Sequence, residues 1–154
     1  MQVIHTSSSL ITEINQDGFF DVCLFFSERK YLPKKVAATY TLELDADKVC
    51  DGSEFNPAGE AEIKAVAELM RLRKGLLTQA DAFALLSEHG RTYDRLCTQM
   101  HPDTHSDHSR DIQHLQGRLA RDLGYHAFLT CDAEGYPVYI VSMTGRLAEL
   151  TLQE

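Results

Sequence analysis

The sequence contains no apolar run that approaches the roughly 20 residues needed for a membrane-spanning helix. Its first residues, Met1 to His5, lack the basic start and long apolar stretch of a secretory signal peptide. No Cys-x-x-Cys pair and no short, ligand-like spacing occurs among the four cysteines, Cys23, Cys50, Cys97 and Cys131. We therefore expect a cytoplasmic protein whose thiols are reduced and packed in the core.

Basic residues are few, because 15 Lys and Arg stand against 23 Asp and Glu, which gives a formal net charge of −8. Non-specific binding to nucleic-acid phosphates requires clustered Lys and Arg, so this composition predicts no direct nucleic-acid binding. A partner with a basic surface suits the charge better. The length of 154 residues fits one domain, residues 1–154, by the prior of about 100 to 200 residues per domain.

The N-terminal third has the alternating apolar pattern of β-strands. Strands are expected over residues 2–5, 19–26 and 38–44, and a short helix over residues 9–15. Residues 45–58 are acidic and rich in turn-forming residues, which predicts a loop. This part of the chain is therefore predicted to be mostly β.

The middle of the chain has the spacing and the capping residues of helices. A first helix is expected to begin at Asn56-Pro57 and to end at Gly75, with one buried face formed by Ile63, Val66, Ala67 and Met70. A second begins at a capping box that starts at Thr78 and ends near residue 90, and a third apolar face spans residues 93–100. We interpret residues 56–108 as a helical insertion.

The last forty-odd residues combine a helix, a strand and a tight turn. A helix capped by Ser109 is expected to end at Gly124, since apolar residues recur at helical spacing at Ile112, Leu115, Leu119 and Leu123. An apolar strand over residues 126–131 leads into a hairpin turn over residues 132–135. A carboxylate at this position is available to a cleft, which makes Asp132 and Glu134 candidates for a functional role. The alternative is that Asp132 only starts the turn. The fold class is α+β with a helical middle.

A second constellation is a group of histidines and carboxylates: His101, Asp103, His105, Asp107, His108, Asp111 and His114. Residues of these types can bind zinc or another divalent metal. The segment is also rich in Pro, Ser, Thr and Asp, which is typical of a solvated loop before a helix. We favour the loop and expect no metal site.

Three segments resemble the elements of the ADP-ribosyltransferase fold. Val3 to Ser7 resembles its first strand, which ends in a histidine followed by a small residue, and Asp17 to Ser27 resembles its turn and aromatic strand. Leu123 to Tyr125, with Asp132 to Gly135 and Tyr139 to Val141, resembles the part that supplies the catalytic carboxylate. The resemblance covers roughly the first and last 45 residues. It implies a compact, mixed β core of the ADP-ribosyltransferase type, into which the helical middle is inserted.

Within that fold, the C-terminal part is most similar to the anti-CRISPR ADP-ribosyltransferases directed against type I-F systems. The similarity rests on the relative spacing of Gln113, Leu115, Gly117, Leu119, Ala120, Leu123, Gly124, Tyr125, Asp132 and Gly135. It implies an enzyme of the host bacterial cytoplasm that uses NAD to attach ADP-ribose to a Cas subunit of a CRISPR surveillance complex.

The resemblance also implies roles for individual residues. Asp132, or otherwise Glu134, favours the positive charge that develops on the ribose, while His5 holds the adenine-side ribose together with Thr6. Ser27 is a candidate for binding the nicotinamide amide. The wall on which nicotinamide stacks is expected among four aromatic residues that could equally belong to the core: Phe25, Phe26, Tyr31 and Tyr40.

Two positions depart from the wider family. Thr6 stands where many members have glycine, and Asp132 stands where many have glutamate. The subclass that begins with an arginine is excluded, because the first arginine is Arg29, far beyond the opening strand. Two alternatives to a CRISPR-directed transferase stay open: a toxin of the same fold with another host target, and a non-catalytic acidic decoy that covers a basic DNA-reading surface.

Overall fold

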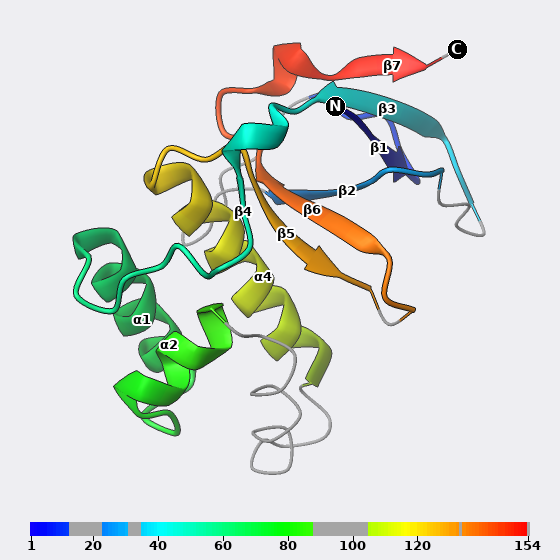
Figure 1. Ribbon diagram of the computed structural model, residues 1–154. Coiled ribbons are helices and arrows are strands. Elements are labelled where there is room, and N and C mark those ends of the chain that lie inside the picture. Colours follow the sequence, from blue (N-terminus) through cyan, green and yellow to red (C-terminus); the bar gives the residue numbers. More distant parts are fainter. Residues whose placement is uncertain (13–22, 31–34, 88–104, 133, 154) are drawn as a thin grey trace.

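A computed structural model describes residues 1–12, 23–30, 35–87, 105–132 and 134–153, with only the backbone for 105–109. In this part of the chain, a mixed seven-stranded sheet carries three helices on one side (Figure 1). The strand order is β4-β5-β6-β2-β1-β3-β7. The bounds are β1 Gln2–Ser7, β2 Cys23–Ser27, β3 Ala38–Glu43, β4 Val49–Cys50, β5 Ala127–Cys131, β6 Pro137–Ser142 and β7 Thr151–Gln153. The architecture is therefore α+β.

The sheet separates into two halves between β1 and β2. These strands pair at a single position, Ile4 with Ser27. By contrast, β1 pairs with β3 from Gln2↔Glu43 to Ser7↔Ala38, and β2 pairs with β6 along its whole length. Figure 1 shows the half formed by β1, β3 and β7 diverging from the half formed by β2, β6 and β5. Side chains of β1 and β2 near the division are thus free to line a hollow instead of a continuous sheet surface.

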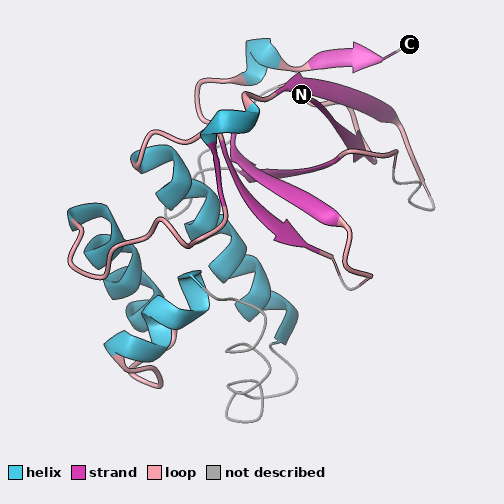
Figure 2. Ribbon diagram, viewed as in Figure 1, coloured by secondary structure: helices cyan, strands magenta, loops and turns pink. Residues whose placement is uncertain are grey.

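Helix α4, His105–Asp122, packs along β5 and β6, and the helices α1, Glu60–Leu72, and α2, Gln79–Ser87, pack against α4 (Figure 2). The approach of α4 to the sheet is close at Gly117. A Cβ atom there would lie 2.7 Å from Cys23 Sγ and 2.9 Å from Ile140 Cγ2. Glycine therefore allows α4 to contact both β2 and β6 directly.

Local signals placed several element ends correctly. The α4 helix is followed by Gly124, whose φ of 87° is the left-handed conformation that favours glycine at a helix end. Helix α2 begins at the expected cap, where Thr78 Oγ1 accepts a hydrogen bond of 3.1 Å from the backbone N–H of Asp81. The strand predicted over residues 38–44 is confirmed as β3, and the turn after β5 is confirmed at residues 132–135.

The first helix differs from its prediction in both start and buried face. It begins at residue 60 with Gly59 as N-cap, and the Glu62 carboxylate reaches back past this cap to accept the Asn56 N–H at 2.7 Å. Its buried residues are Glu62, Ala65 and Leu69, whereas Ile63 is 54% exposed. The helix packs against both α4 and α2, so its buried stripe centres on Leu69.

Other predictions were wrong because contacts between distant segments decide them. Residues 9–12 form no helix; the Ile11 N–H donates to the Tyr40 hydroxyl at 2.8 Å instead. The predicted loop over 45–58 contains β4, which pairs in parallel with β5. Helix α4 begins at residue 105, not after Ser109. The predictions for residues 13–22 and 88–104 lie outside the described residues.

The described cysteines are free thiols. Cys23 and Cys50 are buried as expected, and burial raises the pKa of the Cys50 thiol to about 12. The expectation of a core position was wrong for Cys131, which is exposed at the end of β5. Cys97 lies outside the described residues.

Among the described residues, no helix is both long enough and apolar enough to cross a membrane.

Candidate functional site

The division between β1 and β2 is hollowed, and we call this space the cleft hollow. Its volume is about 310 Å³. Its lining comes from β1, β2, β6 and the end of β5: Ile4, His5, Thr6, Phe25, Phe26, Ser27, Asp132 and Val138. Six of these eight residues were predicted from the sequence as site residues. The fold therefore brings together side chains that are more than 100 residues apart in the chain.

The His5 ring is held in one orientation at the edge of this hollow. Its Nδ1 lies 2.8 Å from the Phe25 backbone oxygen. A carbonyl can only accept, so Nδ1 carries the hydrogen, and Nε2 of the neutral ring remains a hydrogen-bond acceptor. The ring also packs against Phe26, with 5.5 Å between ring centroids. His5 thus links the two halves of the sheet, and among the described residues its Nε2 has no hydrogen-bond partner.

A second space, the turn hollow, adjoins the cleft hollow and shares Ser27 and Asp132 with it. Its volume is about 670 Å³. It lies between the segment after β2 and the β5–β6 turn, and its lining is Ser27, Glu28, Arg29, Lys30, Asp132, Glu134, Tyr136 and Pro137. Ligand sites in proteins commonly have volumes of about 300 to 1,000 Å³. The two hollows together have the size of a small-molecule site.

The Asp132 carboxylate both organises the turn and faces the hollows. Its Oδ1 accepts hydrogen bonds of 2.9 Å from the backbone N–H groups of Glu134 and Tyr136. The interpretation of Asp132 as a turn residue is therefore correct. The turn uses only one of the two carboxylate oxygens. Asp132 is half-buried and lines both hollows, and its Oδ2 has no hydrogen-bond partner among the described residues. Glu134 is exposed and lines the turn hollow.

The remaining predicted residues are distributed unevenly. The Ser27 hydroxyl donates to the Arg29 carbonyl, within its own loop. Phe25 is half-buried beside the His114 ring, at 6.2 Å between centroids, while Phe26 belongs to the core. Tyr40 is buried on β3 and is absent from the described lining of both hollows. Tyr31 lies outside the described residues.

The sequence interpretation missed the charged segment after β2. The Tyr139 hydroxyl on β6 donates to Glu28 Oε1 at 2.6 Å. The Arg29 guanidinium lies over the Tyr136 ring, 3.1 Å from its centroid. These contacts join the segment after β2 to the hairpin that carries Asp132. The available sequence signal was the run of three charged residues directly after an apolar strand.

Tyr139 should give this contact a measurable pH dependence. Burial and the hydrogen bond to Glu28 raise the pKa of Tyr139 to about 12, compared with about 10 in an unfolded chain. The neutral phenol is favoured by folding, so its contribution to stability is complete below pH 10 and is lost as the pH rises from about 10 to 12. We expect Tyr139→Phe to lower the free energy of unfolding by about 1 kcal/mol at pH 8.

Denaturant unfolding of both proteins at pH 8 and pH 11 checks this expectation. The difference between wild type and Tyr139→Phe should shrink at pH 11. A difference that stays constant or grows would contradict a raised pKa of the Tyr139 phenol in the folded protein.

The described members of the histidine-rich constellation have structural contacts. Asp111 forms an ion pair of 2.7 Å with the buried Arg73, and His114 packs at the edge of the Phe25 ring. His101 and Asp103 lie outside the described residues, and the side chains of residues 105–109 are likewise not described. Within the described part, no group of three or more His, Cys, Asp or Glu residues is arranged to hold a metal ion.

Comparison with known proteins gives a likeness in structure. No protein-family model and no curated protein sequence matches the chain. The fold is similar to a solved structure described as "Crystal structure of an anti-CRISPR protein", with a TM-score of 0.52 and 20% sequence identity. The match covers 99% of this chain and 93% of that chain. At this identity, the comparison shows a shared fold.

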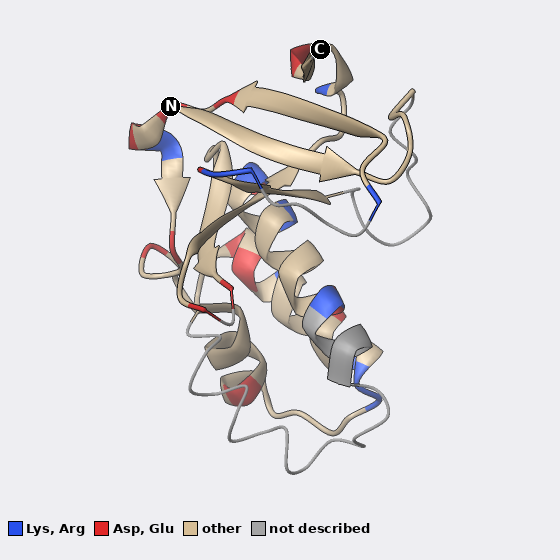
Figure 3. Cartoon of the chain, turned by 90° about the vertical axis from the view of Figure 1, so that its right-hand side faces the viewer, with Lys and Arg blue, Asp and Glu red and all other residues tan. Residues whose placement is uncertain are grey.

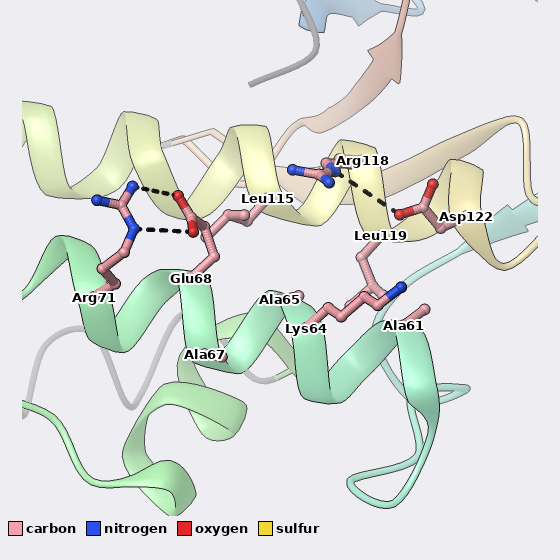
Figure 4. Close-up of a pocket in the computed structure, with 10 residues that line it drawn as sticks. All are labelled: Ala61, Lys64, Ala65, Ala67, Glu68, Arg71, Leu115, Arg118, Leu119 and Asp122. Atoms are coloured by element: carbon pink, nitrogen blue, oxygen red, sulfur yellow. Dashed lines mark hydrogen bonds and ion pairs between the residues drawn. The ribbon is translucent and has the colours of Figure 1, made fainter. Parts of the chain in front are cut away.

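A third space lies between α1 and α4, with a volume of about 380 Å³ (Figure 4). Its floor is made of alanines and of Leu115 and Leu119. Its charged residues largely neutralise each other, since Arg71 pairs with Glu68 at 2.6 Å and Arg118 with Asp122 at 3.9 Å. Its lining includes no histidine and no serine, threonine or cysteine. This space therefore offers fewer side chains that could bind or activate a ligand than the cleft and turn hollows do.

Proposed function

We propose that this protein is an NAD-dependent mono-ADP-ribosyltransferase that inactivates a protein of a CRISPR system, in particular a Cas subunit of a type I-F surveillance complex. The observation that carries the proposal is the cleft hollow. His5, Thr6, Phe25, Phe26, Ser27 and Asp132 were selected from the sequence by resemblance to such transferases, and they line one space. The similarity in fold to an anti-CRISPR protein supports the choice of target system.

The chemistry available in the hollow fits this reaction. NAD supplies a ribose whose bond to nicotinamide can break, and the acceptor's nucleophilic atom forms the new bond to the same ribose carbon while its proton is released. In the proposal, Asp132 Oδ2 faces the ribose and favours the positive charge that develops there. His5 Nε2 accepts a hydrogen bond from a ribose hydroxyl.

The rigidity of these two groups supports their roles. The Asp132 carboxylate is oriented by two backbone N–H groups, and the His5 ring by the Phe25 carbonyl. A group that is already oriented requires no reorganisation when the charge develops, which is how electrostatic stabilisation lowers a barrier. The half-buried Phe25 supplies an apolar wall of the same hollow.

The decisive experiment combines the protein with NAD and a purified type I-F complex, followed by intact-mass measurement of every subunit. We expect one Cas subunit to gain the mass of one ADP-ribose unit and the complex to lose DNA binding. Modification of a different host protein, with the complex unmodified, would favour the toxin alternative. Inhibition of the complex without NAD and without any gain in mass would favour the acidic decoy and contradict the proposal.

Substitution of His5 tests the placement of the ribose. We expect His5→Ala to weaken NAD binding by about 1 to 2 kcal/mol through loss of one hydrogen bond and of ring packing. Calorimetric titration with NAD measures the change. Gln2→Ala is the matched control, because Gln2 lies on the same strand but is exposed and bonds to Glu43. Equal NAD affinity in wild type and His5→Ala would remove His5 from the proposed site.

A further inference from the structure

The arginines of this protein differ in how their charge is compensated. Basic residues are spread over several elements (Figure 3). Five arginines lie within ion-pair distance of a carboxylate: Arg71, Arg73, Arg118, Arg121 and Arg146. Arg29 and Lys30 have no carboxylate partner among the described residues, although the protein has a net charge of −8. Both residues line the turn hollow.

Three carboxylates line the same hollow, and within the described residues none of them forms an ion pair with Arg29 or Lys30. Glu28 accepts the hydrogen bond of Tyr139, and Asp132 Oδ1 accepts two backbone N–H groups of the turn. Glu134 also lines the hollow and is exposed. The N–H groups of Arg29 and Lys30 therefore remain available for an anion that enters the hollow.

The Arg29 guanidinium is also oriented. Its central carbon lies over the Tyr136 ring, 3.1 Å from the ring centroid. This contact places the guanidinium beside the turn hollow, and a guanidinium carries paired N–H donors that match two phosphate oxygens at once. Lys30, next in the chain, adds a second positive charge without such directionality.

We propose that Arg29 and Lys30 form a subsite for the diphosphate group of a dinucleotide. The turn hollow adjoins the cleft hollow through Ser27 and Asp132, so a ribose beside His5 and a diphosphate beside Arg29 can belong to one ligand. The identification of that ligand as NAD rests on the proposed function. The subsite itself requires only a ligand that carries a nucleoside diphosphate.

The experiment measures binding instead of turnover. ADP-ribose, which carries the diphosphate, and adenosine, which lacks it, are titrated into wild type, Arg29→Gln, Lys30→Gln and the double variant by calorimetry at low and moderate salt. We expect each substitution to weaken ADP-ribose binding about tenfold at low salt, and the double variant to lose most of its salt dependence. Adenosine affinity should change little.

Three further variants separate charge from structure. Arg29→Lys keeps the charge and should retain more affinity than Arg29→Gln. Tyr136→Leu removes the ring beneath Arg29 but keeps the cation, so it should cost less than Arg29→Gln. Lys64→Gln, in the space between α1 and α4, removes one charge far from the turn hollow and should leave ADP-ribose binding unchanged.

The outcomes distinguish this proposal from the proposed function. If wild type transfers ADP-ribose but the double variant binds it as tightly as wild type, the diphosphate subsite is wrong and the transferase stands. If wild type consumes no NAD but binds ADP-ribose through Arg29 and Lys30, the subsite stands and the transferase is wrong. An equal loss of adenosine and ADP-ribose binding in the variants would show that these residues act on the fold of the site, which overturns the subsite.

Discussion

Replacement of Asp132 by asparagine is expected to abolish ADP-ribose transfer while changing NAD affinity by less than about tenfold. Asparagine keeps a side-chain oxygen that can accept the two turn hydrogen bonds now made by Oδ1, from Glu134 and Tyr136. It removes the negative charge and replaces the Oδ2 acceptor by an amide NH2 donor. An interaction that is stronger in the transition state than in bound NAD lowers the rate when it is lost, without a comparable loss of affinity. One lost electrostatic contact of this kind typically costs about 3 to 4 kcal/mol in barrier height.

The measurement pairs single-turnover transfer, followed by mass spectrometry, with NAD titration of the same variants. Asp132→Ala should be equally inactive and should in addition loosen the turn. Glu134→Ala is the matched control, because Glu134 lies in the same turn but is exposed. If Glu134→Ala is inactive and Asp132→Asn is active, the fold assignment stands, but the essential carboxylate is Glu134, two residues later. Full activity in both variants would contradict a role for the turn carboxylates in catalysis.

Replacement of the buried Gly117 by valine is expected to disrupt the packing of α4 on the sheet. A Cβ at this position would lie 2.7 Å from Cys23 Sγ and 2.9 Å from Ile140 Cγ2, and valine adds two further methyl groups. Both contacts belong to strands of the sheet, so α4 must move away from β2 and β6. We expect a loss of about 3 kcal/mol in the free energy of unfolding, at the upper end for overpacking.

Chemical denaturation of Gly117→Val and of Arg118→Val tests this expectation. Arg118 is the next residue of α4 and is partly exposed, so its replacement carries the same β-branched cost in a helix without the clash. The control should lose less than about 1 kcal/mol. Equal losses in the two variants would show that the close packing of α4 on the sheet contributes little to stability.

The candidate site was accessible to sequence interpretation because its parts lie at the ends of predictable elements. His5 is near the end of an alternating strand, Ser27 ends an aromatic strand, and Asp132 follows an apolar strand at a turn. Each of these positions has a local signal. That they face one another depended on a resemblance between segments, since no local pattern relates His5 to Asp132 across more than 100 residues.

The charged segment after β2 shows where such interpretation stops. Glu28, Arg29 and Lys30 are exposed, and a charged run of this kind usually belongs to a solvated surface. Their contacts are made with Tyr139 and Tyr136, in a hairpin on the opposite end of the sequence. Tyr139 can pair with Glu28 only if β2 and β6 are neighbouring strands, and the amino-acid sequence of neither segment indicates this.

The sequence by itself determined the features that depend on nearby residues: the helix end at Gly124, the cap at Thr78, the alternating strand β3 and the turn at Asp132. Helix capping, left-handed φ and strand alternation each depend on residues close together in the chain, so each produces a local sequence pattern that can be recognised. Tertiary structure alone decided the two-residue strand β4, the buried stripe of α1 and the separation of β1 from β2. These three features depend on which distant segments pack against each other. Burial of apolar surface stabilises a contact whatever the separation of the two residues in the sequence, so only the packing of the whole chain decides them.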